Sequence, residues 1–232
     1  MGCIHKGGGG LYSRVVVGAV LLAAGAGSRL GGRPKALLEL GGVPLIRRQL
    51  IALSGAGVDE VVVVLGHHSE AVEAAVRDFP VSLARNLSPD DGQASSVRIG
   101  LAALSGKLDA VLVALADQPL INAQDISELI AAFKQRGPGI QMVVPRCDGE
   151  PGNPVIFDAA LREEWLAGDV NAACRRWREA NPERVQWLDT ANTRYRVDID
   201  TPDDLERFTA RTGHVLRWPT LPTLLTLQKV TV

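Results

Sequence analysis

The chain has 232 residues, of which 46% are hydrophobic and 22% charged, and its formal net charge is −1 at pH 7. This composition is typical of a globular protein and excludes a disordered chain, a collagen and a coiled coil. The near-zero charge and the aromatic content of 4% argue against nucleic-acid and membrane-surface binding, so we expect neither partner.

The three cysteines are too few and too scattered for a disulfide framework or a zinc site. They stand at positions 3, 147 and 174. Such sparse cysteine use is typical of a reducing compartment, and we expect a cytoplasmic protein.

The apolar stretch at residues 15–24 allows two interpretations. It follows Lys6 and Arg14 and ends in Ala-Gly-Ala, as a cleavable signal peptide would. It is too short for a transmembrane helix, which needs about 20 apolar residues. Its β-branched beginning, Val15–Val17, fits a buried strand equally well, and we favour the strand. Residues 1–13 are then a flexible lead-in.

Strand and helix signals alternate along the rest of the chain. Uninterrupted apolar runs, typical of strands buried on both faces, alternate with segments of helical periodicity. The expected strands are 15–22, 60–65, 81–84, 110–116, 140–145, 155–157 and 185–188. The expected helices are 44–54, 69–78 with Ser69 as N-cap, 94–104, 122–135 with an Asn122–Asp125 capping box, segments up to about 180, and one starting at Thr201–Pro202.

This order predicts an α/β fold: a Rossmann-like, three-layer α/β/α single domain with a mostly parallel sheet. We place the domain at residues 14–212. Residues 213–232 form a C-terminal tail, and the sequence leaves open whether it packs on the domain.

A glycine-rich segment, Leu21–Lys35, begins at the end of the first strand. Its small residues let backbone N–H groups approach phosphate oxygens, and Arg29 and Lys35 add positive charge. It is not a P-loop, because Ala36 rather than Ser or Thr follows the lysine. It also lacks the dinucleotide fingerprint, because Leu30 stands at the third glycine position and no acidic residue ends the second strand. We interpret it as a phosphate-binding loop.

Two acidic clusters indicate a metal site. Asp117 closes the expected strand at 110–116, and Asp198 and Asp200 lie on the same side of an extended segment. Mg²⁺ usually takes one or two carboxylates together with substrate phosphates. We therefore interpret Asp117 as a Mg²⁺ ligand, and Asp198 and Asp200 as candidates for the metal or for an acceptor substrate. For the mechanism we assign Asp198 to the metal and Asp200 to the acceptor.

Two loops carry further candidates. The polar segment 86–97 leads into a helix and offers Asn86, Gly92, Ser95 and Ser96 as contacts to a ribose or base; an ordinary capped helix start fits it equally well. The turn-rich segment 148–154 offers Gly152 and Asn153 as contacts to the acceptor.

These motifs together resemble a known family. The loop Leu-Ala-Ala-Gly-x-Gly-x-Arg-x-Gly…Lys is similar to the signature of the pyrophosphorylase-type nucleotidyltransferases, with one extra residue before Lys35. With Gly92-Gln-x-Ser-Ser, Asp117-Gln-Pro, Gly152-Asn-Pro and Asp198-Ile-Asp-Thr-Pro, the chain resembles the molybdenum cofactor nucleotidyltransferases over about residues 15–210. The Ala-Ala-Gly at the loop resembles the cytidylyltransferase branch, whereas many of those enzymes carry His where Asn153 stands.

The resemblance implies transfer of CMP from CTP to the phosphate of molybdenum-bound molybdopterin, with release of pyrophosphate. It implies Mg²⁺ as cofactor, with a molybdenum hydroxylase apoenzyme among the expected partners. Lys35 and Arg29 are then the catalytic residues. The nucleotide contacts are then Leu22, Ala23, Ala24, Gly25, Gly27, Ser28, Asn86, Gly92, Ser95 and Ser96.

Three other functions stay open. A sugar- or polyol-phosphate nucleotidyltransferase would share the loop and the aspartates. An NAD(P)H-dependent oxidoreductase is disfavoured by the missing glycine and acidic residue. A non-catalytic nucleotide-binding partner of a molybdenum hydroxylase would not need both the charged loop and Asp117.

Overall fold

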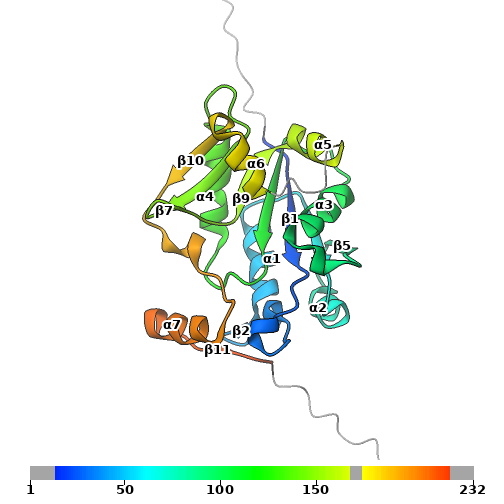
Figure 1. The fold of residues 1–232 in the computed structure, drawn as a ribbon, viewed down its shortest axis with the longest axis vertical. Helices are drawn as coiled ribbons and strands as arrows, with labels where there is room; N and C mark the ends of the chain where they lie inside the picture. Colours follow the sequence, from blue (N-terminus) through cyan, green and yellow to red (C-terminus); the bar gives the residue numbers. More distant parts are fainter. Residues whose placement is uncertain (1–13, 168–173, 220–232) are drawn as a thin grey trace, which may run out of the picture.

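The computed structural model describes residues 14–167 and 174–219, and its centre is one mixed sheet (Figure 1). Its strands are β1 (Val17–Ala23), β4 (Glu60–Leu65), β5 (Ser82–Arg85), β6 (Ala110–Leu115), β7 (Met142–Cys147), β8 (Glu150–Pro151), β9 (Val155–Asp158) and β10 (Val185–Asp189). The order is β10-β7-β9-β6-β1-β4-β5, with β8 paired to β7. Strand β1 pairs in parallel with β4 and β6, whereas β9 runs antiparallel to β6 and β7. The expectation of a mostly parallel sheet is confirmed.

Helices cover both faces of this sheet. Those packed on one face are α1 (Leu45–Gly55), α2 (Ser69–Val76) and α4 (Ala123–Lys134), and those on the other are α3 (Gln93–Ala103), α5 (Ala159–Ala167) and α6 (Cys174–Ala180). Short 3₁₀ turns connect them: η1 (Ser28–Leu30), η2 (Lys35–Leu37), η3 (Pro89–Asp91), η4 (Pro182–Arg184) and η5 (Thr193–Arg196). The predicted three-layer α/β/α architecture is thereby confirmed.

The position of strand β1 between two helical layers explains why polar and apolar residues do not alternate in its sequence. All seven of its residues are buried. Val20 and Leu22 pack in the cluster with α3 and α5, whereas Leu21 and Ala23 pack with α1 and α2. Successive side chains of a strand point to opposite faces, so a strand between two helical layers must be apolar at every position. The stretch read alternatively as a signal peptide contains β1, an inner strand of the sheet that pairs with β4 and β6.

Close packing of α3 on the sheet depends on Gly100. A Cβ at this position would lie 2.3 Å from Val20 Cγ1 and 2.8 Å from Val64 Cγ2. Only a residue without a side chain therefore allows the helix to approach β1 and β4 this closely. Gly100 therefore sets how close α3 lies to the sheet.

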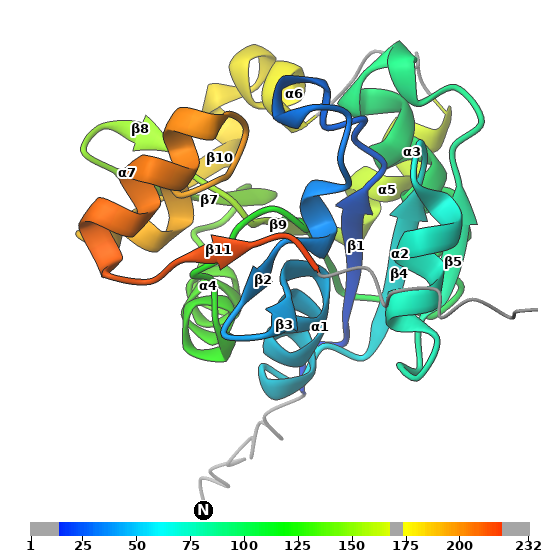
Figure 2. The same ribbon diagram turned by 90° about the horizontal axis from the view of Figure 1, so that it is seen from below.

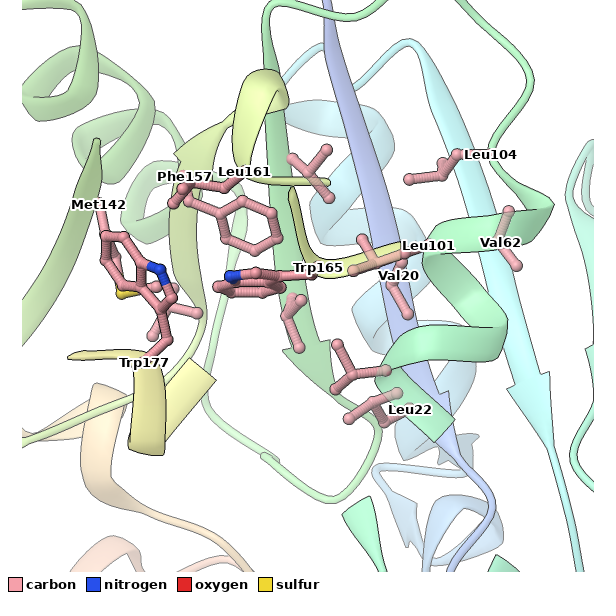
Figure 3. Close-up of a cluster of buried hydrophobic side chains, with 14 of the residues drawn as sticks. Val20, Leu22, Val62, Leu101, Leu104, Met142, Phe157, Leu161, Trp165 and Trp177 are labelled. Atoms are coloured by element: carbon pink, nitrogen blue, oxygen red, sulfur yellow. The ribbon is translucent and has the colours of Figure 1, made fainter. Parts of the chain in front are cut away.

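An aromatic cluster closes the core beneath α5 and α6 (Figure 3). The ring centroid of Trp165 lies 4.6 Å from that of Phe157 and 6.0 Å from that of Trp177. Figure 3 also shows Met142 and Leu161 beside these rings. The three rings bury large apolar areas in tilted or edge-on contacts, so they bind the two short helices to the sheet.

A second, small sheet lies at the end of the molecule toward which β1 points (Figure 1). It consists of β11 (Leu216–Arg217), β2 (Glu39–Leu40) and β3 (Val43–Pro44) in antiparallel pairs. Helix α7 (Pro202–Thr212) packs beside it through Phe208, which shares an apolar cluster with Leu38 and Leu216. Figure 2 looks onto this end, where β11 crosses beside β2.

The sequence-based expectations differ from these elements in several places. The small sheet was not expected, because two-residue strands carry no periodic signal. Ser69 is the first residue of α2 rather than its N-cap, which is His68. The predicted Asn122–Asp125 capping box is formed, and Thr201 is the N-cap of α7, as expected, in a capping box with Asp204 that was not predicted. The predicted boundary at residue 212 precedes β11, which pairs with β2; residues 1–13 and 220–232 lie outside the described residues.

None of the helices in the described ranges has both the length and the apolar character to cross a membrane.

Candidate active site

A cavity of about 450 Å³ opens at the carboxyl ends of β1 and β6. Ligands of open parallel sheets bind at this end of the strands. Its walls come from the glycine-rich segment, the start of α3, the end of β6 and the segment before α7. The lining residues are Leu22, Ala23, Ala24, Gly25, Pro34, Lys35, Ala36, Pro89, Gly92, Gln93, Ser96, Leu115, Ala116, Asp117, Asn153, Asp198 and Asp200.

Lys35 is the charged centre of this cavity. Its Nζ donates hydrogen bonds to Asp117 Oδ2 and Asp200 Oδ1, both at 2.5 Å. The side chains of Lys35 and Asp117 are each 18% exposed, and that of Asp200 is 44% exposed. Three residues far apart in the sequence are therefore joined in one ion-pair network.

The pKa values in this network follow from burial and from the neighbouring charges. Burial favours the neutral amine of Lys35, but the carboxylates of Asp117 and Asp200 outweigh it, and its pKa is above the ordinary value. Burial raises the pKa of Asp117, although Lys35 opposes this shift. Burial and the neighbouring carboxylates of Asp117 and Asp200 also raise the pKa of Asp198. A further cation in the cavity would stabilise these carboxylates in their charged form.

One backbone contact sets the acidic segments side by side. The N–H of Ile199 donates to the carbonyl oxygen of Asp117 at 3.2 Å. Ile199 is fully buried, while its neighbours Asp198 and Asp200 both line the cavity. The alternation expected from the sequence therefore holds, with the apolar residue inside and the two carboxylates on the cavity side.

The carboxylates of Asp117 and Asp198 fit the chemistry of a divalent cation. Asp117 Oδ1 is buried and has no hydrogen-bond partner, although a buried carboxylate oxygen is normally paired. In the described residues, no three His, Cys, Asp or Glu side chains are already arranged around a metal position. A cation here would therefore take one or two carboxylates and complete its shell with substrate phosphates and water.

The glycine-rich segment turns sharply above the cavity. Gly27 is the N-cap of η1, with φ +63°, and its carbonyl accepts the N–H groups of Leu30 and Gly32. Arg29 is 70% exposed and lies 3.9 Å from Asp200 Oδ2, so it reaches the network from the rim. Gly25 is the residue of this turn whose backbone faces the cavity beside Lys35.

The loop between β5 and α3 is held by a buried amide. Asn86 Nδ2 donates to Ser95 Oγ at 2.8 Å and to Ser96 Oγ at 2.9 Å, and its Oδ1 accepts the N–H of Ser88. Asn86 is 5% exposed and does not line the cavity. Its hydrogen bonds instead place the first turn of α3, including Gln93, along the cavity wall.

A backbone carbonyl fixes the opposite wall. Tyr195 O accepts the N–H of Asn153 at 2.8 Å and the Nε2 of Gln118 at 3.1 Å. The turn η5 that carries Tyr195 is itself fixed by Asp125, a fully buried carboxylate that accepts two nitrogens of the Arg194 guanidinium. Asn153 and the residue after Asp117 are therefore positioned by the same atom.

Two histidines at the end of β4 brace the loops around the cavity. His68 Nε2 lies 3.1 Å from the carbonyl oxygen of Ala26, and His67 Nε2 lies 2.9 Å from Asp90 Oδ1. They connect the glycine-rich turn and the β5–α3 loop to the sheet. Neither histidine was among the residues predicted for the site, because partners this far away along the chain leave no sequence signal.

The structure brings most of the candidate residues to one cavity. Those that line it are Leu22, Ala23, Ala24, Gly25, Lys35, Gly92, Ser96, Asp117, Asn153, Asp198 and Asp200. Those that lie behind or beside it are Gly27, Ser28, Arg29, Asn86, Ser95 and Gly152. Gly152 donates its N–H to Pro145 O and thus shapes the loop before Asn153. The residues that line the cavity and were not predicted are Pro34, Ala36, Pro89, Gln93, Leu115 and Ala116.

Comparisons with known proteins find a matching family and a similar full-length relative. The model of the family described as "MobA-like NTP transferase domain" matches residues 19–185. The chain is 34% identical over 200 residues to "Nicotine blue oxidoreductase" of Paenarthrobacter nicotinovorans, covering 82% of this chain and 95% of that protein.

Two solved structures share the fold. The Mycobacterium tuberculosis H37Rv protein Rv0371c has a TM-score of 0.72 at 24% identity, covering 85% of this chain and 100% of that one. A nucleotidyl transferase from Methanothermobacter thermautotroptrophicus has a TM-score of 0.67 at 28% identity, covering 84% of this chain and 97% of that one.

Proposed function

The chain belongs to the family of MobA-like NTP transferase domains and is a nucleotidyltransferase, and from this premise we propose that it transfers CMP from CTP to a phosphate-bearing acceptor, molybdenum-bound molybdopterin. The observation that carries the proposal is the cavity in which Lys35, Asp117, Asp198 and the glycine-rich turn meet. It combines cationic, carboxylate and backbone N–H groups, as a triphosphate with a divalent cation requires.

The chemistry needs positioning more than proton transfer. An oxygen of the acceptor phosphate is already anionic at neutral pH, so no general base is required. This oxygen attacks the α-phosphorus in line, a new P–O bond forms, and pyrophosphate leaves with the electron pair of the broken bond. The ammonium of Lys35 then stabilises the charge on the phosphoryl oxygens, and Arg29 at the rim holds the triphosphate.

Mg²⁺ suits the two carboxylates of the cavity. Asp117 and Asp198 would hold it, with the unpaired Asp117 Oδ1 as the first ligand. The bound ion would neutralise phosphate charge and align the reacting groups. Lys35 already occupies Asp117 Oδ2, so the second oxygen of the same carboxylate is left for the metal.

The choice of CTP is supported by the Ala23-Ala24-Gly25 sequence, which resembles the cytidine-specific branch. Ala24 is 7% exposed and lines the cavity, so this part of the loop lies at the site where the nucleotide would bind. The choice of molybdopterin is supported by the same resemblance, through Asn153 and the Asp198-Ile-Asp200 segment.

The deciding experiment is pyrophosphate release in the presence of Mg²⁺. CTP, GTP, UTP and ATP are compared with and without molybdenum-loaded molybdopterin, and with sugar and polyol phosphates as competing acceptors. Release that requires both CTP and molybdopterin supports the proposal. Release with a sugar or polyol phosphate alone would reassign the acceptor, and no release with any nucleotide would reject the reaction.

An oxidoreductase is the second candidate, because one relative that matches over most of both chains carries that name. The glycine-rich segment of this chain still lacks the third glycine and the acidic residue of the dinucleotide fingerprint. Fluorescence titration with NADH and NADPH separates the two functions. Saturable binding that CTP does not displace would favour the oxidoreductase.

A further inference from the structure

A second cavity, of about 290 Å³, lies between η5 and α7 and borders the first. Helix α7 is the orange helix at the left of Figure 2. The lining residues are Leu120, Thr193, Arg196, Val197, Asp198, Asp204, Arg207, Phe208, Arg211 and Thr212. Asp198 lines both cavities, so a molecule in the second cavity would reach the carboxylate beside the reacting phosphates.

Three guanidinium groups line this second cavity, and two of them are not neutralised. Arg207 pairs with Asp204 Oδ1 at 2.5 Å. Arg211 donates only to the hydroxyl of Thr193, at 3.3 Å, and Arg196 makes no hydrogen bond or ion pair within residues 14–167 and 174–219. Arg196 and Arg211, both exposed, therefore have no ion-pair partner in the second cavity.

The two acidic residues that line the second cavity, Asp198 and Asp204, each have another role. Asp204 Oδ2 accepts the N–H groups of Asp200 and Thr201, and so completes the capping box of α7. In the proposed function, Asp198 belongs to the metal. The cavity therefore presents net positive charge, with hydroxyls from Thr193 and Thr212 and an apolar wall from Leu120 and Phe208.

We propose that this second cavity binds an anionic group of the acceptor, separate from the phosphate that reacts. Guanidinium groups with unfilled donors recognise phosphate and carboxylate groups by paired hydrogen bonds. The triphosphate would lie at the glycine-rich turn, on the other side of Asp198. The anion in the second cavity consequently belongs to the acceptor, and the acceptor carries at least two anionic groups.

This assignment rests on the proposed function for the identity of the ligand, but the anion site can be tested without it. The first experiment titrates inorganic phosphate into the protein by calorimetry. The variants are Arg196→Gln, Arg196→Gln/Arg211→Gln and Lys35→Ala, with Arg175→Gln as control. Arg175 is an 81% exposed residue of α6 whose ion pair is with Glu179.

We expect a phosphate site that the double variant weakens at least tenfold and that Lys35→Ala and Arg175→Gln leave unchanged. Arg196→Gln alone should weaken it severalfold, and because this side chain makes no hydrogen bond or ion pair in the part of the chain that the structure describes, melting temperatures should match the parent protein. Unchanged phosphate binding in the folded double variant would overturn the site.

The second experiment measures pyrophosphate release with CTP and the acceptor. The double variant should raise the KM for the acceptor at least tenfold and change the KM for CTP less than twofold. An unchanged acceptor KM, with phosphate binding lost, would overturn the assignment to the acceptor. If no nucleotide releases pyrophosphate in any variant, the proposed function fails, and the calorimetric titration still decides whether the cavity binds anions.

Discussion

A Cβ on Gly27 would lie 1.9 Å from the carbonyl oxygen of Arg33. This contact is far inside van der Waals distance, so the turn from β1 to Lys35 can close only when residue 27 has no side chain. The glycine is required both by this approach and by its φ of +63°. It acts on the site indirectly, because it places Gly25 and Lys35 on the cavity wall while it does not line the cavity itself.

We expect Gly27→Ala to lower kcat/KM for CTP by about tenfold or more. The added methyl costs about 1–2 kcal/mol from the left-handed backbone alone, and the clash with Arg33 forces the loop to move. Gly31→Ala is the matched control, because Gly31 has φ +71° but open space around it. Steady-state kinetics with both variants separates the two causes; equal losses would show that the close approach to Arg33 does not matter.

Lys35→Ala should lower kcat by about 10²–10³-fold, the loss typical of removing one preorganised charge from a transition state. Asp117 and Asp200 lose their shared cation, but both reach the cavity and can be solvated there or bind a metal, so the fold should persist. Turnover and melting temperature are measured together, with Lys107→Ala, an exposed lysine, as control. A nearly normal rate in the folded variant would exclude the catalytic role.

Asp117→Asn should raise the Mg²⁺ concentration for half-maximal activity at least tenfold. The amide keeps the shape of the side chain but removes the negative charge that attracts a divalent cation. Mn²⁺ binding followed by electron paramagnetic resonance provides a readout independent of turnover. Asp91→Asn, in the exposed turn η3, should leave both measurements unchanged. Equal Mn²⁺ affinity in parent and Asp117→Asn would place the metal elsewhere.

Glu60→Gln should destabilise the protein by about 1 kcal/mol at neutral pH, the usual value of a hydrogen-bond contribution. The Glu60 carboxylate accepts the N–H groups of Ser105 and Gly106 at 2.8 and 2.9 Å. Partial burial raises its pKa, but these hydrogen bonds lower it more, and the net pKa is below the ordinary value. The parent protein should therefore exceed Glu60→Gln in free energy of unfolding by the full amount above the ordinary carboxyl pKa, about 4.3. This difference should disappear as the pH falls through the lowered pKa of Glu60 in the folded protein.

Urea unfolding of both proteins between pH 7 and pH 2.5 measures this difference. Glu206→Gln, an exposed residue of α7, is the control. A difference in free energy of unfolding that stays constant down to the lowest pH would show that the charge of Glu60 does not contribute to stability.

Local sequence patterns were sufficient to predict the layers of the fold. Strand β1 and strand β4 are apolar runs, and the helices between the strands repeat apolar residues at helical spacing, so the alternation could be read directly. The glycine-rich turn was equally visible, because small residues at short spacing are a local signal. The small sheet of β2, β3 and β11 was not, since two-residue strands are decided by their partners.

The components of the cavity at the carboxyl ends of β1 and β6 could therefore be predicted from the sequence alone: a glycine-rich loop, a lysine after it, and the carboxylates of Asp117, Asp198 and Asp200. Only the tertiary structure decided how they meet. Lys35 lies 82 residues from Asp117 and 165 from Asp200, and contacts at such separations depend on the packing of the whole sheet. The wall formed by Asn153 depends on the carbonyl of Tyr195, a backbone atom that every residue possesses and that no sequence pattern can single out.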